Sequence, residues 1–368
     1  MRVTVQPYEK GLFEALCKEY TGGNLSEMGN ARFYTHYGKE QLTHISEYSL
    51  CNEIRTVTCP LPEYGIKPES TSLSEKKNDA SLYQICVDNR RINCGMSYVL
   101  HLPDGRFFII DGGYFSKGED HRLYSFLRTL QPEGKLAIAG WFFSHAHQDH
   151  IGAFIYFVWQ YRGEYEIDAL YYTFPSLSLP EAERFSSFDN STIREFFYCI
   201  DRAIPEVKRC YLHTGDRFSL ASIDFEVLFT HEDIYPEKIG TFNNTSTVLR
   251  FTCEGQSVLF LGDLQTASCR KLELMMGEAL KSDVVQIAHH GFNGSTVETY
   301  DLVSPEIALW PTCAEGYHGN CERTVNAHII AMPCVKEHII AGIHGSRKLS
   351  LPYTAGSSTE VDIPLLPL

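Results

Sequence analysis

Apolar runs of strand length recur along the chain from residue 97 onward and alternate with segments of helical spacing. Residues 97–102 and 106–114 are strand-like and flank a Pro-Asp-Gly turn at 103–105, which predicts a β-hairpin. Residues 135–144 are almost continuously apolar, as in a strand covered on both faces, and residues 151–161 follow as a buried helix. Further strands are expected at 169–174, 224–230, 246–253, 257–263, 284–290 and 307–312, and helices at 123–130, 190–204, 267–280 and 324–332. Strands interleaved with helices in this way predict an α/β layered domain.

The first part of the chain is less regular. Residues 9–20 have helical spacing, residues 53–60 are strand-like, and residues 64–80 are polar, as in an exposed connection. We therefore divide the chain into an N-terminal elaboration of unknown role at 1–75 and a catalytic domain at 76–368.

Charge narrows the classes of partner. With 32 basic and 46 acidic residues, the formal net charge is −14. Long duplex DNA and membrane surfaces favour a net basic protein, so neither is expected as a partner. A small molecule or a short nucleic acid remains compatible as substrate, because bound metal ions supply local positive charge. No apolar run approaches the roughly 20 residues that span a membrane, and the N-terminus lacks the core of a signal peptide.

Cysteine usage indicates the compartment. Twelve cysteines are scattered without a C-x-x-C pair, which argues against a cysteine-zinc site or a redox dithiol. In a chain without an export signal we expect these thiols to be reduced and the protein to be cytoplasmic, with disulfide pairing as the alternative. The sequence does not indicate an oligomeric state.

The stretch WFFSHAHQDHIGAF, residues 141–154, concentrates metal-binding side chains where the buried strand ends. His145 and His147 are two positions apart, so on extended backbone both imidazoles point to one side and can bind one metal. Asp149 and His150 are adjacent, where the chain turns into the helix, and are suited to a second metal. Imidazole with carboxylate favours zinc and also accommodates iron or manganese. A purely structural interpretation, with Asp149 as a helix cap, leaves three histidines unexplained.

Two distant segments offer further ligands. Asp263 follows an apolar strand and Gly262, and a carboxylate there can bridge two cations. His289 and His290 end another strand before Gly291. Alone, an aspartate at a strand end is more often a turn residue, but after the H-x-H-x-D-H motif both segments become candidate ligand sites.

Together these motifs carry a family resemblance. FFIIDGG, SHAHQDHIGA, LFLGD and IAHHG, in this order, resemble the motifs of the metallo-β-lactamase superfamily. NNTSTVLRF, the Gly-Asp that follows, AHHGFNGS and the segment at 213–230 resemble more closely the metallo-β-lactamase-like domain of the competence protein ComEC. The likeness covers about residues 90 to 350 and implies an αββα sandwich with a metal site at one edge of its two sheets.

The resemblance also implies roles for the residues that match its motifs. His145 and His147 would bind the first metal, and Asp263 would bridge the two. The second metal would be held by Asp149, His150 and His290. Asp111 would support the ligand loop rather than bind metal. The cofactor would be two divalent ions, most simply zinc, with manganese or iron as alternatives.

One ligand position departs from the superfamily. Many members carry another histidine where this chain has Asn243 and Asn244, and an amide is a weaker zinc ligand than imidazole, so occupancy of the first site is open. We assign Asn244 a supporting or substrate-facing role. His213 and His231 are alternative replacements for the missing histidine.

Two more histidines are candidates for contact with substrate. His289 precedes the expected ligand His290 and would face the substrate. His318 lies in the segment 313–320, which we expect to be a glycine-rich loop, and would contact substrate or protonate a leaving group.

These residues predict a metal-dependent hydrolase in which a metal-bound hydroxide attacks phosphorus or a carbonyl carbon. The resemblance favours a phosphodiester, in a nucleotide, an oligonucleotide or a phosphorylated headgroup, with Asp263, His289 and His318 as the catalytic residues. Hydrolysis of a thioester, lactone or lactam is the alternative reaction. A non-catalytic, metal-stabilised binding protein is the alternative of another class. A di-iron oxidoreductase is disfavoured, because such relatives carry Glu where His147 stands and need a flavin domain.

Overall fold

The structure is a computed structural model, and it describes residues 2–5, 57–60, 79–90, 94–115, 118–175, 187–234, 239–292 and 294–365. The helix expected at 9–20 lies outside these residues, as does most of the exposed segment expected at 64–80. Within the first 75 residues, β1 (Arg2–Val5) pairs antiparallel with β2 (Val57–Pro60), which forms the second half of the strand expected at 53–60.

One large sheet contains the strand that leads to the metal motif. Its nine strands are β3 (Ser81–Gln84), β4 (Ser97–His101), β5 (Phe107–Asp111), β6 (Leu136–Phe142), β7 (Tyr165–Ile167), β8 (Ala169–Tyr172), β9 (Lys208–Tyr211), β17 (Ser346–Ser350) and β18 (Thr359–Val361). They follow the order β18-β17-β3-β4-β5-β6-β8-β9, with β7 paired to β6. β4 and β5 form the expected hairpin, and β5, β6 and β8 run parallel. The near-continuous apolar run at 135–144 is thus a central strand, as predicted.

The second sheet carries the later motifs. Its seven strands, in spatial order, are β10 (Arg217–Leu220), β11 (Ile223–Phe229), β12 (Val248–Cys253), β13 (Gln256–Phe260), β14 (Val284–Gln286), β15 (Ile307–Trp310) and β16 (Glu337–Ile340). The first four are antiparallel neighbours, and β13 to β16 run parallel. Asp263 and the His289–His290 pair therefore follow neighbouring parallel strands, whose carboxyl ends lie at one edge of the sheet.

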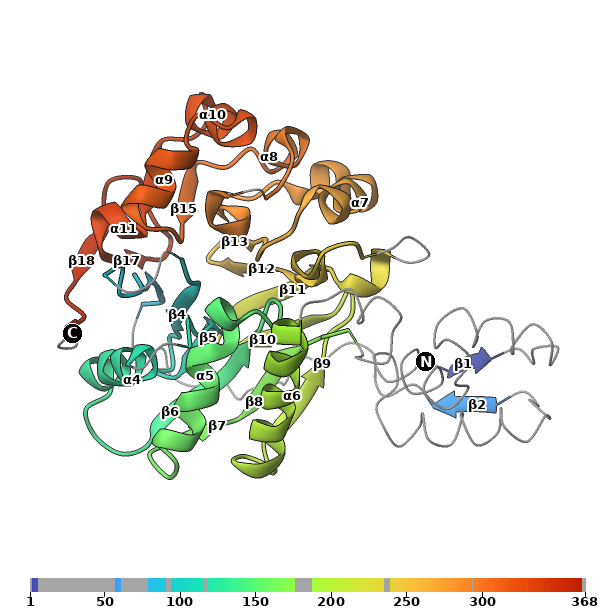
Figure 1. Ribbon diagram of the computed structural model, residues 1–368, viewed down its shortest axis with the longest axis vertical. Helices are drawn as coiled ribbons and strands as arrows, with labels where there is room; N and C mark the ends of the chain where they lie inside the picture. Colours follow the sequence, from blue (N-terminus) through green and yellow to red (C-terminus); the bar gives the residue numbers. More distant parts are fainter. Residues whose placement is uncertain are drawn as a thin grey trace.

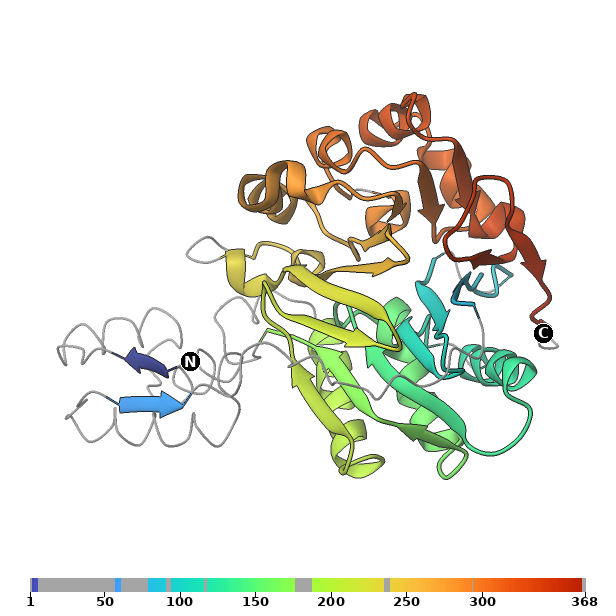
Figure 2. The ribbon, with the colours of Figure 1, turned by 180° about the vertical axis from the view of Figure 1, so that it is seen from behind.

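Helices cover the outer faces of both sheets. They are α4 (Glu119–Leu130), α5 (Gln148–Gln160), α6 (Ser187–Arg202), α7 (Thr266–Met276), α8 (Val297–Val303), α9 (Ala314–Asn320), α10 (Thr324–Ala331) and α11 (Ala341–His344). α4, α5 and α6 lie beside the first sheet, and α7 to α10 lie on the side of the second (Figure 1). Seen from behind, the strands of both sheets lie between these two groups of helices (Figure 2). This arrangement is the expected αββα sandwich.

Apolar side chains fill the space between the sheets and the space beneath the helices. Between the sheets, Phe108 packs against Phe225 with ring centroids 4.5 Å apart. Beneath the helices, Trp141 of β6 packs edge-on against Phe154 of α5, with centroids 4.8 Å apart. Because these rings are fully or almost fully buried, their burial holds β6 and α5 in a fixed relation and so positions the turn between them.

One local expectation is wrong. The segment 313–320, expected as a glycine-rich loop, contains α9 (Ala314–Asn320) with Cys313 as its N-cap. The Cys313 sulfur accepts a hydrogen bond from the backbone N–H of Gly316 and so caps the start of this helix. The two glycines of the segment led to the wrong prediction of a loop. None of the helices in the described ranges combines the length and apolarity needed to cross a lipid bilayer.

The loop after β5 clamps the first turn of α5. The Gly112 N–H donates to His150 O, and the Ala153 N–H donates to Gly113 O. The closest approach is at Gly152, where an added Cβ would lie 2.2 Å from the Phe115 Cβ and 2.5 Å from the Phe115 nitrogen. Glycine is needed here because the backbone of the loop occupies the space of a side chain.

We therefore expect Gly152→Ala to destabilise the fold by about 1–3 kcal/mol through this overlap. Gly319→Ala is the matched control, because Gly319 is also helical but an added Cβ meets no atom within 4 Å. The control should be neutral or stabilising by up to about 1 kcal/mol. Urea unfolding followed by circular dichroism measures both; equal stability of the two variants would contradict the clamp.

Candidate metal centre

The metal motif lies on the turn between β6 and α5. β6 ends at Phe142, and α5 begins at Gln148 with His147 as its N-cap in extended conformation. His145 and His147 thus precede the helix, while Asp149 and His150 lie in its first turn. A strand end followed at once by a helix start lets six consecutive residues direct four ligand side chains to one place.

His145, His147 and Asp263 form the first ligand cluster, in which one candidate ligand atom from each residue lies within 4.8 Å of the others. The Nε2 atom of His145 is 3.0 Å from Nδ1 of His147 and 3.8 Å from Oδ2 of Asp263. Two ring nitrogens and a carboxylate oxygen at this spacing are within reach of one cation with bonds of about 2.0–2.2 Å.

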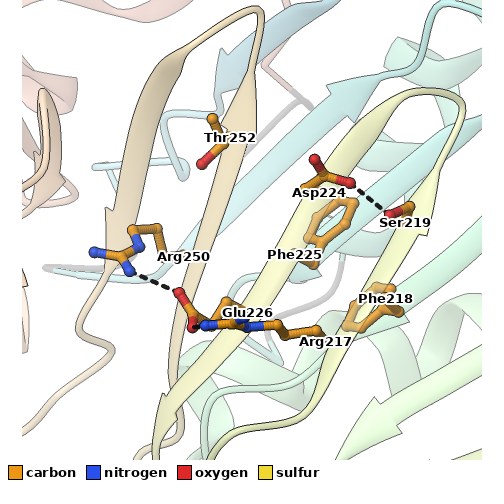
Figure 3. Close-up of a pocket in the computed structure, with 8 residues that line it drawn as sticks. All are labelled: Arg217, Phe218, Ser219, Asp224, Phe225, Glu226, Arg250 and Thr252. Atoms are coloured by element: carbon orange, nitrogen blue, oxygen red, sulfur yellow. Dashed lines mark hydrogen bonds and ion pairs between the residues drawn. The ribbon is translucent and has the colours of Figure 1, made fainter. Parts of the chain in front are cut away.

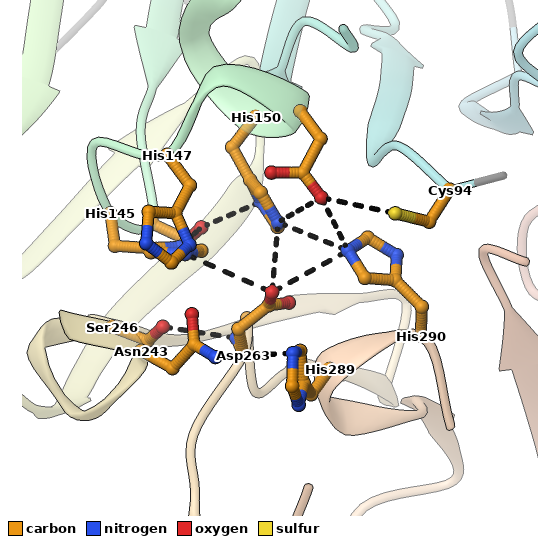
Figure 4. A network of polar contacts seen from close by, with 12 residues as sticks. Cys94, His145, His147, His150, Asn243, Ser246, Asp263, His289 and His290 are labelled. Atoms are coloured by element: carbon orange, nitrogen blue, oxygen red, sulfur yellow. Dashed lines mark hydrogen bonds and ion pairs between the residues drawn. The ribbon is translucent and has the colours of Figure 1, made fainter. Parts of the chain in front are cut away.

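Asp149, His150, His290 and Asp263 form the second ligand cluster. His290 Nε2 is 3.0 Å from Asp149 Oδ2, 3.4 Å from Asp263 Oδ2 and 3.3 Å from His150 Nε2. His150 Nε2 is 3.2 Å from Asp263 Oδ2. Figure 4 shows His150, Asp263 and His290 converging on one place. They come from the first turn of α5, the turn after β13 and the turn after β14.

Asp263 belongs to both clusters, and it supplies the clearest test of whether cations fit. Its side chain is buried, and its Oδ1 atom has no hydrogen-bond partner among the described residues. A buried carboxylate oxygen without a partner is costly unless an ion satisfies it. The residues therefore fit a divalent cation, and Asp263 is a member of both clusters.

Neighbouring groups orient two of the histidines. His150 Nδ1 is 2.6 Å from Asp111 Oδ2, and His290 Nδ1 is 2.8 Å from the carbonyl oxygen of Pro311. Because both partners are acceptors, each Nδ1 carries the proton and each Nε2 turns toward the cluster. This is the common arrangement of histidine ligands whose other nitrogen donates to a carboxylate or a carbonyl.

The two clusters differ in electrostatics. Burial, with His150 and His147 nearby, holds the pKa of His145 well below its usual value, so this ring stays neutral. For His150, burial is outweighed by Asp263, Asp111 and Asp149, which raise its pKa well above the usual value. For His290, Asp263 and Asp149 likewise outweigh burial and raise the pKa well above the usual value. The second cluster is thus the richer of the two in negative charge, which favours a cation there.

Three residues of this site have a strained backbone. Asp111, His289 and His290 have φ values of 55°, 50° and 54°, a region that residues with a side chain rarely adopt. Such strain persists where the surrounding structure enforces it, and it gathers at functional sites. Here it turns the ends of β5 and β14 so that Asp111 and His290 reach the centre.

The remaining predicted residues have different surroundings. His289 Nε2 is 3.1 Å from the Asn243 side-chain nitrogen, and Asn244 donates to Ile239 O and accepts from the Gln265 N–H. His318 lies exposed on α9, with its ring 5.5 Å from that of Tyr317. In the part of the chain that the structure describes, His213 and His231 belong to neither ligand cluster; His213 Nδ1 lies 2.8 Å from Glu232 Oε2.

Three supporting residues received no role from the sequence. The buried Ser144 hydroxyl donates to Asp111 Oδ2, and the Ser246 hydroxyl accepts from the Asp263 N–H. Cys94 places its sulfur 3.4 Å from Asp149 Oδ2. The two serines lie inside the quoted motifs, so their position was a signal, whereas nothing in the sequence near Cys94 indicated proximity to Asp149.

A separate pocket lies on β10, β11 and β12, and no ligand of either cluster lines it (Figure 3). Its charged side chains satisfy one another: Glu226 accepts from Arg217, and its other oxygen lies 2.6 Å from an Arg250 nitrogen. Because the two arginines share one carboxylate, the pocket has little free positive charge to offer a substrate.

The family model of the metallo-beta-lactamase superfamily matches residues 95–303, more than half of the chain. The chain therefore belongs to this superfamily, and it is a metal-dependent hydrolase of the metallo-β-lactamase fold. The closer likeness to the ComEC-type domain is not established by this match. Among proteins with curated functions, none has significant sequence similarity to the chain.

Several solved structures are similar to the chain at low sequence identity. The metallo-beta-lactamase fold protein YhfI from Bacillus subtilis is 14% identical, with a TM-score of 0.44 over 71% of this chain and 97% of that one. Igni18, a metallo hydrolase from Ignicoccus hospitalis, is 12% identical, with a TM-score of 0.39 over 71% of this chain and 95% of that one. CmlA, a diiron beta-hydroxylase from Streptomyces venezuelae, is 12% identical, with a TM-score of 0.44 over 90% of this chain and 60% of that one. At these values the likeness carries no conclusion about activity.

We expect Asp111→Asn to weaken metal binding about 10- to 100-fold. The new amide would place a donor against the protonated Nδ1 of His150, so His150 would lose its orientation. Zinc affinity, measured by competition with a chromophoric chelator, tests this. Asp224→Asn, which alters an exposed carboxylate in the separate pocket, is the control and should bind zinc as the wild type does.

Proposed function

We propose that the protein hydrolyses a phosphodiester with two divalent cations, most simply zinc, held by the two ligand clusters. The observation that carries this proposal is the position of Asp263, which belongs to both clusters and has an unpartnered buried oxygen. A closed structural zinc site has four protein ligands and no shared carboxylate, whereas paired cations are typical of phosphatases and nucleases.

When bound, two such cations lower the pKa of a coordinated water toward about 7 and polarise the group under attack. The residues of the chain then have separate tasks. Asp263 is the ligand common to both clusters. Asp111 keeps the ligand nitrogen of His150 directed at the cluster, and Pro311 O does the same for His290. His289, at the rim of the first cluster, contacts the substrate, and His318 on α9 supplies a proton to the leaving oxygen.

The substrate we propose is a nucleotide, a short or single-stranded oligonucleotide, or a phosphorylated headgroup. The ComEC-type motifs support a phosphodiester, and the net charge of −14 disfavours long duplex DNA. The described cysteines form no disulfide, which supports a reducing compartment, and we propose the cytoplasm.

Two rivals predict different outcomes. The same ligands could hydrolyse a thioester, lactone or lactam, which requires turnover on those substrates. A metal-stabilised binding protein would hold cations and ligand but form no product.

The test combines metal content with turnover. Protein purified without chelator should contain close to two metals per chain by plasma mass spectrometry, and it should hydrolyse bis-p-nitrophenyl phosphate but not thioesters or lactones. Asp263→Ala should lose at least one metal and reduce turnover by about 10³-fold or more, because both cations lose a shared ligand. Asp224→Asn should leave both unchanged.

Turnover only on thioesters or lactones would contradict the phosphodiester proposal and support the alternative substrate class. Metal binding without turnover on any of these substrates would support the metal-stabilised binding protein instead of an enzyme.

A further inference from the structure

The two ligand clusters have unequal numbers of protein ligands. Among the described histidines, cysteines and acidic residues, the second cluster has four members and the first has three: His145, His147 and Asp263. A cation in the first cluster needs at least one more donor, and the amide oxygen of asparagine is a ligand type outside those three residue classes.

Asn243 offers such an oxygen. Its side chain is 8% exposed, and its Oδ1 atom is buried without a hydrogen-bond partner among the described residues. Asn243 lies in the 3₁₀ turn η3 (Phe242–Thr245), and the ring of its neighbour Phe242 is centred 4.9 Å from that of His147. Figure 4 shows the Asn243 amide between His289 and the His145–His147 pair, with its oxygen on the side of the two histidines.

Neighbouring contacts set the direction of this oxygen. The Asn243 nitrogen is 3.1 Å from His289 Nε2, an interaction that occupies the NH₂ end of the amide. The backbone around it is anchored as well, because the Thr247 N–H donates to Ser144 O and Ser246 accepts from the Asp263 N–H. The turn that carries Asn243 is thus hydrogen-bonded to the segment before His145 and to Asp263, and it directs a buried amide oxygen toward the first cluster.

Asn244, the adjacent residue of the same type, is used differently. Its nitrogen donates to Ile239 O, and its oxygen accepts from the Gln265 N–H, so both ends of its side chain are satisfied by backbone groups. Its contacts brace the chain between Asp263 and α7. Asn244 therefore supports the fold, whereas the side-chain oxygen of Asn243 lacks a partner among the described residues.

We infer that Asn243 Oδ1 is the fourth protein ligand of the cation in the first cluster, with His289 as the residue that positions the amide. This inference rests on the proposed two-cation function. The first site then has two nitrogen and two oxygen donors, one of them a neutral amide. Imidazole suits zinc, whereas carbonyl oxygen suits manganese and magnesium, so the first site should bind zinc more weakly than the second and exchange its metal more readily.

Zinc titration of chelator-stripped protein against a chromophoric chelator tests the assignment without measuring activity. Wild type should bind two equivalents, the second more weakly than the first. Asn243→His, which supplies an imidazole, should tighten the weaker equivalent about 10-fold or more, and Asn243→Leu should weaken it about 10-fold or more. The tighter equivalent should not change, and it serves as an internal control for folding, together with the unfolding temperature of each metal-free variant.

Cobalt(II) gives an independent readout. The visible absorption of the second cobalt equivalent should shift between wild type and Asn243→His, because a nitrogen donor replaces an oxygen. Two zinc equivalents with wild-type affinity in both variants would overturn the role of Asn243 while leaving the two-cation proposal intact. A wild-type chain that binds no zinc would instead overturn the two-cation proposal itself.

Discussion

The buried carboxylate of Asp111 is the constraint on which the metal-binding half of the molecule depends. It accepts hydrogen bonds from the Ser144 N–H, the Ser144 hydroxyl and His150, while the Asp111 carbonyl accepts from the Trp141 indole. These bonds join the end of β5 to the end of β6 and to the first turn of α5. Burying a carboxylate without such partners costs free energy, so the folded state requires all three segments to contact Asp111 together. The conformation of the turn between β6 and α5 therefore depends on the Asp111 carboxylate.

The second sheet completes the site through a parallel set of contacts. The Ser246 hydroxyl and the Gln286 side chain hold the turn that carries Asp263, and the His289 N–H donates to Gly262 O. One bond, from the Thr247 N–H to Ser144 O, links this assembly directly to the ligand turn of the first sheet. Since neither sheet supplies a full cluster, the metal centre exists only when the apolar interface between the sheets is closed. Stability of the sandwich and competence of the centre are therefore coupled.

The centre is asymmetric in charge as well as in ligands. Burial lowers the pKa of His145, whereas nearby carboxylates outweigh burial and raise the pKa values of His150 and His290. The first cluster also has fewer histidine and carboxylate members than the second, three against four. Under the proposed function, the two sites would therefore differ in their affinity for a cation.

Much of this could be predicted from sequence, because the signals were local. The H-x-H-x-D-H spacing places its four side chains within six residues, and long apolar runs marked the central strands β5, β6, β12 and β13. The edge strand β18 and its neighbour β17 were missed, since the second partner of β17 is β3, some 260 residues earlier, and short half-exposed strands carry a weak pattern. The segment 313–320 was wrongly predicted as a loop, because its two glycines disfavour a helix and the capping role of Cys313 was not recognised. The sequence assigned Asn244 a supporting or substrate-facing role and gave Asn243 none. Only the contacts around the 3₁₀ turn show that the Asn244 side chain is bonded to backbone groups, whereas Asn243 Oδ1 lacks a partner among the described residues. Short-range periodicity was thus enough to predict the fold class, and the spacing of one motif was enough to indicate candidate metal ligands that the structure brings together. The tertiary structure alone decided which buried oxygens lack partners, because that depends on contacts between segments far apart in the chain.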